Sequence, residues 1–435
     1  MSGLHDKMGA RAFQLLKPGE QKFWKDAEAE LAHCCDYPDL HLGSQWEAPE
    51  KEPFYARYCV MGNGRVAPHG PQDKEWRGAT FGDVPDPEKL HYALRYYMEK
   101  TVHFIAKQDV TESVRFAGSG AHVIQDCSNP GHVFNNLLLN RLFPANGKKL
   151  VFMHRIMDSW PIDLAAVKAP PELLGRTVDE AAYLLGEKIL ANMDKITADM
   201  IPLCQGIIAG HDRKVSRIMQ KWNARAIHFT ASFWHTAFVL ASGRIPAGSR
   251  KRFAAEDLTT HPVITAYDER FDRLKYIAAG IPFYKNLYPE GDPPRANMST
   301  NPYPFEAAVN CAYDANGNPL PLVLRDGKTE LTGNGFAAGA YSVISFTVPG
   351  DIYGELEVIA GIHPASENNC EAVFAVWCCD SDNQLLASGK TTRDGGVIRF
   401  KVALPPECRT LSLLTAGGDG RSSSVWLNPV LKSKL

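Results

Sequence analysis

The feature that most constrains the fold is a change in the spacing of apolar residues along the chain. In the first half, apolar side chains recur every three or four residues, which is typical of helices that bury one face. From Gly335 onward they alternate with polar residues, between short turns rich in Asp, Gly, Asn and Ser. That second pattern is typical of a β-sandwich. The presence of both patterns predicts a multidomain protein.

The first part is predicted to be one all-helical domain over residues 1–243, with a long early loop over residues 32–85. The main predicted helices cover residues 87–107, 110–128, 177–200 and 212–240. Residues 244–334 are dense in Pro, Gly and Asn, yet Phe, Tyr and Ile recur through them. They therefore predict a wrapped connector with short strands. Residues 335–435 are predicted to form an all-β, jelly-roll-like sandwich.

Composition and charge exclude several classes of protein. Of the 435 residues, 45% are hydrophobic and 22% are charged, which excludes wholesale disorder. The formal net charge of −2 at pH 7 leaves no overall positive potential to hold nucleic acid. No transmembrane segment is expected, because no apolar run reaches the roughly 18 residues that a spanning helix needs. No signal peptide is visible at the start of the chain, where an apolar run is missing.

One segment of the predicted helix over residues 110–128 carries most of the chemistry. His122 and Asp126 stand four residues apart, so a helix places them on one face, one turn apart. His132 follows a Pro-Gly turn that can redirect the chain. Imidazole and carboxylate are both zinc ligands. The segment indicates a metal site, although one such His/Asp pair is also common by chance.

A second pair repeats the same spacing. His154 and Asp158 are again four residues apart, and their neighbours are mostly apolar. This predicts that both lie on a buried helix face, where a carboxylate needs a hydrogen-bonding partner or a metal. Two such pairs, with His132 between them, favour metal binding over a coincidence of spacing.

These residues resemble the core of the zinc-dependent phospholipase C and single-strand nuclease superfamily. That family has a His-x-x-x-Asp-x-x-x-x-x-His motif followed by a His-x-x-x-Asp/Glu pair, and the two pairs and His132 match it in order and spacing. The family also has a His that opens its first helix, here His5, and an Asp in an early Tyr-Pro-Asp segment, here Asp39. A further family His precedes the helix that leads into the core. His69 fits that position, with His41 and His91 as rivals.

The resemblance covers roughly residues 1–240 and implies a cluster of up to three zinc ions. In this scheme Asp126 bridges two ions, His69 and His122 hold one of them, His5 holds the other, and His132, His154 and Asp158 hold the third. The implied function is a zinc-dependent phosphodiester hydrolase, phospholipase C-like or nuclease-like, that uses a metal-activated water. Asp39 is implied to orient or deprotonate that water. The family chain begins with a zinc-binding Trp where this chain has Met1, so fewer ions are expected if the N-terminus is incomplete.

The resemblance also implies a phospholipid or nucleic-acid phosphodiester as substrate, and a secreted or periplasmic location. Asn135, just after His132, can reach the phosphate or cap a turn. Tyr55 is one of several aromatic residues in the early loop. These aromatics can pack a lipid or a base, or pin the loop to the helices, and the second interpretation is favoured.

Residues 335–435 resemble NPCBM-type carbohydrate-binding modules. The carrying features are Gly361-Ile362-His363, Val373-Phe374-Ala375-Val376-Trp377 and a closing Trp426-Leu427-Asn428-Pro429. The resemblance implies a glycan partner for this module. Trp377 and Trp426 either stack on sugars or fill the sandwich core, and the core role is favoured. The alternative function is a non-catalytic carbohydrate-binding or surface protein on a degenerate phospholipase C scaffold.

Overall fold

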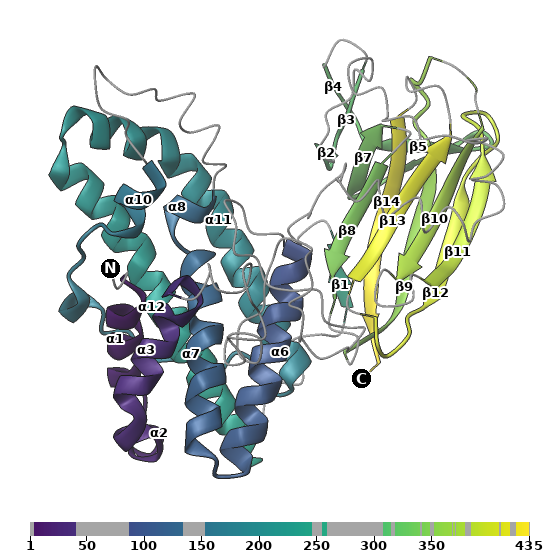
Figure 1. The fold of residues 1–435 in the computed structure, drawn as a ribbon. Coiled ribbons are helices and arrows are strands. Elements are labelled where there is room, and N and C mark those ends of the chain that lie inside the picture. The colour runs from purple at the N-terminus through teal and green to yellow at the C-terminus, as the bar shows by residue number, and fades with distance from the viewer. Residues whose placement is uncertain are drawn as a thin grey trace, which may run out of the picture. The chain divides into compact units, whose positions relative to one another are not determined.

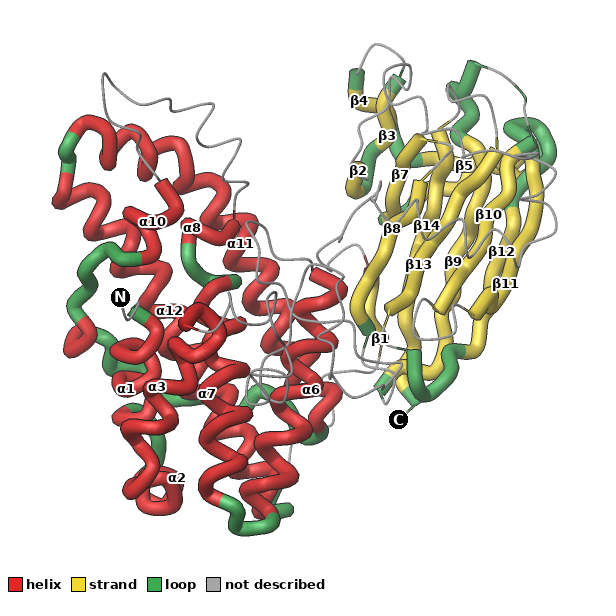
Figure 2. Tube along the Cα trace, viewed as in Figure 1, coloured by secondary structure: helices red, strands yellow, loops and turns green. Residues whose placement is uncertain are grey.

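The chain forms two compact units, Met1–Ala247 and Gly248–Leu435, and each is described by itself (Figure 1). The computed structural model describes residues 4–40, 87–133, 153–245, 255–258, 308–314, 318–339, 342–348, 352–367, 369, 371–378, 384–408, 410–417 and 423–434. The first unit is helical and the second is built of antiparallel strands (Figure 2). The predicted combination of a helical part followed by a β part is therefore confirmed. Among the described helices, none has the length and apolar content needed to cross a bilayer.

The helical unit is organised around helix α7. Its α-helices are α1 (His5–Gln14), α2 (Pro18–Trp24), α3 (Glu28–Leu40), α6 (Pro87–Ala106), α7 (Val110–Asp126), α8 (Pro130–Val133), α10 (Met153–Asp158), α11 (Val178–Ala209) and α12 (Asp212–Ser242). Short 3-10 turns cover Lys25–Ala27 and Leu164–Ala166. Helix α7 packs against α3, α6 and α12. Every residue of α7 from Ser113 to its end is buried except Arg115.

Local signals set the ends of the long helices. The Asp109 side chain accepts a hydrogen bond from Glu112 N and caps α7, and the Thr177 side chain accepts one from Glu180 N and caps α11. Helix α11 ends at Gly210, whose φ of 69° is a conformation that glycine adopts without steric cost. The four main helices predicted from apolar spacing are confirmed. Helix α11 runs nine residues beyond its predicted end, and the other ends shift by at most two residues.

The predicted early loop is wrong over residues 32–40, which continue helix α3 to Leu40 despite Pro38. Tertiary packing accounts for the difference. A Cβ atom added to Gly118 of α7 would lie 2.9 Å from Leu31 O, and one added to Gly9 of α1 would lie 2.5 Å from Cys35 Sγ. These glycines allow close approach to α3, so α1 and α7 support the helix from two sides. Pro38 by itself predicts a break in the helix, and the neighbouring sequence does not show the packing that overrides it.

Tryptophans connect the helices of this unit. Trp24 and Trp234 are fully buried, with their rings 5.8 Å apart in an edge-to-face arrangement. Trp24 Nε1 donates to Ser113 Oγ at 2.9 Å, and Trp234 Nε1 donates to Ala117 O at 3.0 Å. Both hydrogen bonds end on α7, so this core holds the helix that carries His122 and Asp126.

The second unit contains two antiparallel sheets. Its strands are β1 (Ala255–Asp257), β2 (Ala308–Val309), β3 (Ala312–Tyr313), β4 (Pro319–Leu320), β5 (Val323–Asp326), β6 (Thr329–Thr332), β7 (Gly335–Gly339), β8 (Ser342–Thr347), β9 (Tyr353–Ile362), β10 (Ala372–Cys378), β11 (Gln384–Thr391), β12 (Ile398–Ala403), β13 (Thr410–Gly417) and β14 (Ser423–Ser433). One sheet has the order β12-β9-β14-β7-β2, with β1 also paired to β14. The other has the order β11-β10-β13-β8. Strands β3-β4 and β5-β6 form two separate hairpins.

Aromatic side chains fill the space between the two sheets. Trp426 of β14 lies 5.3 Å from the ring of Phe374 in β10, which belongs to the other sheet. Trp426 is fully buried and Trp377 nearly so, which confirms the favoured core role of both. Trp426 Nε1 donates to Thr415 Oγ1 at 3.3 Å. Neither indole ring is available as an exposed platform for a sugar.

Strands from the predicted connector join the larger sheet. Strand β1 pairs with Val430–Lys432 of β14, and β2 pairs with β7. Strand β14 pairs with β7 over its first half, and its register with β9 on the other side shifts between Leu427 and Val430. Asn428, at the shift, has a φ of 51°, which Asn tolerates better than most residues. The closing Asn-Pro pair therefore marks the point where β14 changes partner from β7 to β1.

Candidate metal centre

Four helices carry six of the seven predicted metal ligands. His5 is the first residue of α1, and His122 and Asp126 lie in the last turns of α7. His132 lies in α8, which follows α7 after a short turn, and the pair in α10 begins at its second residue. The four-residue spacing in α7 puts His122 and Asp126 on one face, as the sequence predicts. The end of α7 is the point at which the other elements converge.

The first group of donors consists of His5, His122 and Asp126, and it is almost completely buried. His5 Nε2 lies 3.4 Å from Asp126 Oδ1, and His122 Nε2 lies 3.2 Å from Asp126 Oδ2. The two imidazole rings are 4.3 Å apart between centroids. Each histidine thus points its Nε2 atom at a different oxygen of one carboxylate.

The second group consists of His132, His154 and Asp158. His132 Nε2 lies 3.1 Å from His154 Nε2 and 3.6 Å from Asp158 Oδ1. The prediction that His154 and Asp158 lie on a buried face is only partly right, since both are half-buried. Met153 and Met157 take the fully buried face of α10 instead, because the apolar core in contact with this helix lies on their side.

Asp126 joins the two groups. Its Oδ1 atom lies 3.4 Å from His132 Nε2, the same distance that separates it from His5 Nε2. His5 Nε2 also lies 4.0 Å from Asp158 Oδ1. The six side chains therefore form one continuous cluster, with Asp126 between a buried half and a half-buried one.

The protein holds the far sides of these ligands. His122 Nδ1 lies 2.7 Å from Cys35 O, a carbonyl that can only accept, so Nδ1 donates the proton. The Nε2 atom of neutral His122 then carries a lone pair toward Asp126, as a metal ligand must. Asn129 donates from Nδ2 to Asp158 Oδ1 at 3.5 Å and accepts at Oδ1 from Gly131 N. Gln125 Oε1 lies 2.9 Å from His5 Nδ1 in the same way. Cys35, Gln125 and Asn129 are supporting residues that sequence reasoning missed.

The electrostatics of the cluster favour positive charge between the side chains. Burial alone would raise the pKa of Asp126, but the charges of His122, His132 and His5 outweigh it and hold that pKa well below the usual range. Burial alone would lower the pKa of His132, but Asp126 and Asp158 raise it to about 9. A proton on His132 supplies positive charge here, and a metal cation can supply it in its place.

Asp126 Oδ1 tests whether the residues fit a metal. Within the described part of the chain this buried oxygen accepts no hydrogen bond, although two imidazole nitrogens lie near it. Tetrahedral zinc with bonds of about 2.0–2.1 Å separates its ligands by about 3.3 Å. The separations described above between donors of one group, from 3.1 Å between His132 and His154 to 3.6 Å between His132 and Asp158, bracket that value. The donor types and their spacing both fit zinc.

Several predicted site residues cannot be compared with this geometry. His69, Tyr55, Asn135 and the rival His41 lie outside the described residues. Asp39 belongs to helix α3 and the rival His91 to α6, but their side chains are likewise outside the description. Their roles remain predictions.

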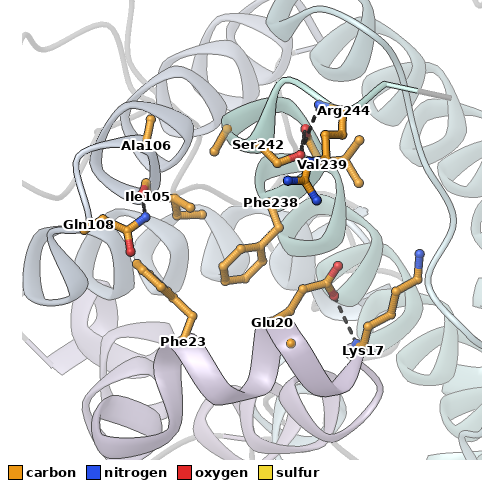
Figure 3. Close-up of a pocket in the computed structure, with 12 residues that line it drawn as sticks. Lys17, Glu20, Phe23, Ile105, Ala106, Gln108, Phe238, Val239, Ser242 and Arg244 are labelled. Atoms are coloured by element: carbon orange, nitrogen blue, oxygen red, sulfur yellow. Dashed lines mark hydrogen bonds between the residues drawn. The ribbon is translucent and has the colours of Figure 1, made fainter.

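A cavity of about 700 Å³ elsewhere in the helical unit differs from the cluster (Figure 3). It lies where α2 meets the ends of α6 and α12, and Phe23 and Phe238 form part of its wall. Glu20 is the one carboxylate among the lining residues that the structure describes. Its oxygens accept from His235 Nδ1 at 2.6 Å and from Lys17 N at 3.0 Å. The protein itself satisfies this acid, unlike Asp126 Oδ1.

No family model and no curated protein match the chain. The C-terminal region resembles solved carbohydrate-binding modules. The CBM51 module of Clostridium perfringens GH95, solved with methyl-galactose, is 22% identical, with 29% of this chain and 88% of that chain covered and a TM-score of 0.25. The CBM51-2 and INT domains of C. perfringens ZmpB, solved with GlcNAc, are 18% identical, with 29% and 28% covered and a TM-score of 0.25. The family 29 module CBM29_1 of Piromyces equi is 12% identical, with 29% and 89% covered and a TM-score of 0.17.

Proposed function

We propose that the helical unit is a zinc-dependent phosphodiester hydrolase. The observation that carries the proposal is Asp126, a buried carboxylate shared by two groups of zinc-type donors, with one oxygen left without a hydrogen bond within the described residues. A single catalytic zinc ion would need only one such group of three protein ligands. Two groups that meet at one carboxylate support a multinuclear centre, which is typical of phosphoester hydrolysis. The same residues are the core of the resemblance to the phospholipase C and nuclease superfamily.

In this proposal His5, His122 and Asp126 hold metal on the buried side, and His132, His154 and Asp158 hold it on the half-buried side. Bound zinc supplies a water that is acidic near neutral pH and a positive charge for the phosphate oxygens. The backbone carbonyl of Cys35 keeps His122 in the tautomer that presents Nε2. The side-chain amide of Asn129 donates to Asp158 Oδ1 and orients that carboxylate.

The half-buried group gives the proposed centre its access to substrate. The side chains of His132 and Asp158 are 12% and 22% exposed, whereas that of His122 is fully buried. A phosphodiester would therefore meet the side of His132 and Asp158 first. Asp39 is proposed to orient or deprotonate the attacking water, and Asn135 and Tyr55 to contact the substrate. The substrate is proposed to be a phospholipid or a nucleic acid.

The proposal is tested by metal content and hydrolysis measured on the same samples. We expect wild-type protein to bind at least about two zinc ions per chain and to cleave phosphatidylcholine or single-stranded DNA. Asp126→Asn should lose zinc and hydrolysis together, whereas the exposed acid variant Asp26→Asn should keep both. Asp39→Asn should keep zinc and lose rate. Wild-type protein that binds no zinc, with all six ligands present, would contradict the proposal.

The alternative, a non-catalytic glycan-binding protein, remains a prediction for the C-terminal module. The burial of Trp377 and Trp426 removes the two rings that the sequence offered as sugar platforms. Binding of the isolated sugars galactose and N-acetylglucosamine, measured by calorimetry on the whole chain, tests this alternative. Sugar binding together with an absence of zinc would favour it over the hydrolase.

A further inference from the structure

We infer that Gln125 is a positioning residue that decides whether His5 can bind metal, an inference that rests on the proposed metal centre. Gln125 precedes Asp126 in α7 and is completely buried. Its Oε1 atom lies 2.9 Å from His5 Nδ1, a contact that connects α7 to the first residue of α1. Gln125 therefore touches the first predicted ligand from the side opposite Asp126.

The orientation of this amide determines which nitrogen of His5 carries the proton. With Oε1 toward the ring, His5 must donate from Nδ1, and its Nε2 lone pair faces Asp126 Oδ1 at 3.4 Å. With the amide reversed, Gln125 would donate to Nδ1 and Nε2 would carry the proton. His5 would then donate to Asp126 and could not ligate a metal.

His5 and His122 differ in this respect. The partner of His122 Nδ1 is the Cys35 carbonyl, which can only accept, so its tautomer has no alternative. The partner of His5 Nδ1 is an amide that can present either an acceptor or a donor. The two histidines of the buried group are thus held by supports of different kinds, one fixed and one reversible.

The amide itself has little preference between its two orientations. Gln125 Nε2 is buried and has no hydrogen-bond partner within the described residues, so reversal would leave Oε1 in that place instead. The contact with His5 is what distinguishes the two states. A cation at His5 Nε2 is compatible only with the Oε1-facing orientation, so metal binding and amide orientation are coupled.

The test compares Gln125→Glu, whose carboxylate can only accept, with Gln125→Met, which has similar length and no hydrogen bond. Gln220→Met is the matched control, because the side chain of Gln220 bonds the backbone of Asp163 and not one of the proposed ligands. Nitrogen-15 NMR of the imidazoles reports the tautomer of His5 in metal-free protein, and competition with a zinc-binding dye reports affinity. Thermal unfolding of each variant identifies any that fails to fold.

We expect Gln125→Glu to keep the Nδ1-protonated form of His5 and wild-type zinc affinity. Gln125→Met should lose that preference and weaken zinc binding about 10-fold, and Gln220→Met should change neither. An unchanged tautomer and unchanged affinity in Gln125→Met would overturn the inference while leaving the proposed function intact. If wild-type protein binds no zinc, the proposed function fails. The tautomer spectra still decide the role of Gln125 in that case, supporting it if Gln125→Met shifts His5 and overturning it if it does not.

Discussion

Buried histidines occur in both units, but they are used differently. In the sandwich, His363 accepts from Ala365 N at Nδ1 (3.1 Å) and donates from Nε2 to Pro321 O (2.9 Å). Both nitrogens are therefore engaged by the polypeptide backbone. In the helical unit, His5 directs Nδ1 to the side-chain oxygen of Gln125 and His122 directs Nδ1 to the Cys35 carbonyl, and both turn Nε2 toward Asp126. Burial of a histidine is thus a poor guide to a site, and the partner of its second nitrogen is a better one.

The same contrast appears in the pKa values. Burial lowers the pKa of His363 below its ordinary value, even though Pro321 O favours the protonated ring. At His132 the neighbouring carboxylates overcome burial and raise the pKa to about 9. The sandwich holds a neutral histidine as part of its structure, whereas the helical unit gathers charge around a point that a cation can occupy.

The largest expected effect is the loss of folding stability when a buried tryptophan is removed from either unit. Trp426→Ala should cost the sandwich about 3–5 kcal/mol, because it removes the ring that fills the space between its sheets. Zinc bound per chain should not change. Trp234→Ala should cost a similar amount in the helical unit and also weaken zinc binding, because Trp234 supports α7. Chemical denaturation and metal analysis measure both, and loss of zinc in Trp426→Ala would break the comparison.

The second prediction concerns the histidines themselves. His122→Ala should weaken zinc binding by more than about 100-fold, because it removes a ligand together with its support. His363→Ala should leave zinc affinity unchanged and cost the sandwich about 1–3 kcal/mol, because Pro321 O and Ala365 N lose their partner. Zinc titration and urea unfolding distinguish the two. Equal zinc affinity in wild type and His122→Ala would contradict the distinction drawn between His122 and His363.

The smallest effect is a pH dependence of opposite sign in the two units. In metal-free protein the raised pKa of His132 stabilises the helical unit fully below pH 6.5, and this stability is lost as pH rises toward about 9. The lowered pKa of His363 stabilises the sandwich above pH 6.5, and this stability is lost as pH falls through its folded value. Each slope is at most about 1.4 kcal/mol per pH unit. The free energy of unfolding of each unit can be followed by the helical and β circular dichroism signals between pH 5 and pH 9. The two units should show opposite trends with pH, and saturating zinc should abolish only the trend of the helical unit. Parallel trends in the two units would count against this assignment.

Much of the fold could be predicted from local pattern. The helices over 87–106, 110–126 and 212–242 follow from apolar spacing and end signals, and the sandwich strands follow from alternation. The stretch over residues 32–40 could not be predicted, because Pro38 argues locally against a helix. The contacts that maintain it come from Gly9 and Gly118, far away in the sequence. Strands β1 and β2 show the same limit, since their partners β14 and β7 are distant along the chain.

In the candidate site, too, some features could be predicted from local sequence and others depend on tertiary packing. The sequence by itself determined the donor types and the pairing of His122 with Asp126, because four residues in a helix return to the same face. Only the tertiary structure decided that His5 and His132 share one oxygen of Asp126, and that Cys35 and Gln125 set the tautomers behind them. Helical spacing is a property of the local backbone, whereas the meeting of α1, α3, α7 and α8 depends on which side chains pack between them. For that reason the ligands could be named from the sequence, but their supports could not.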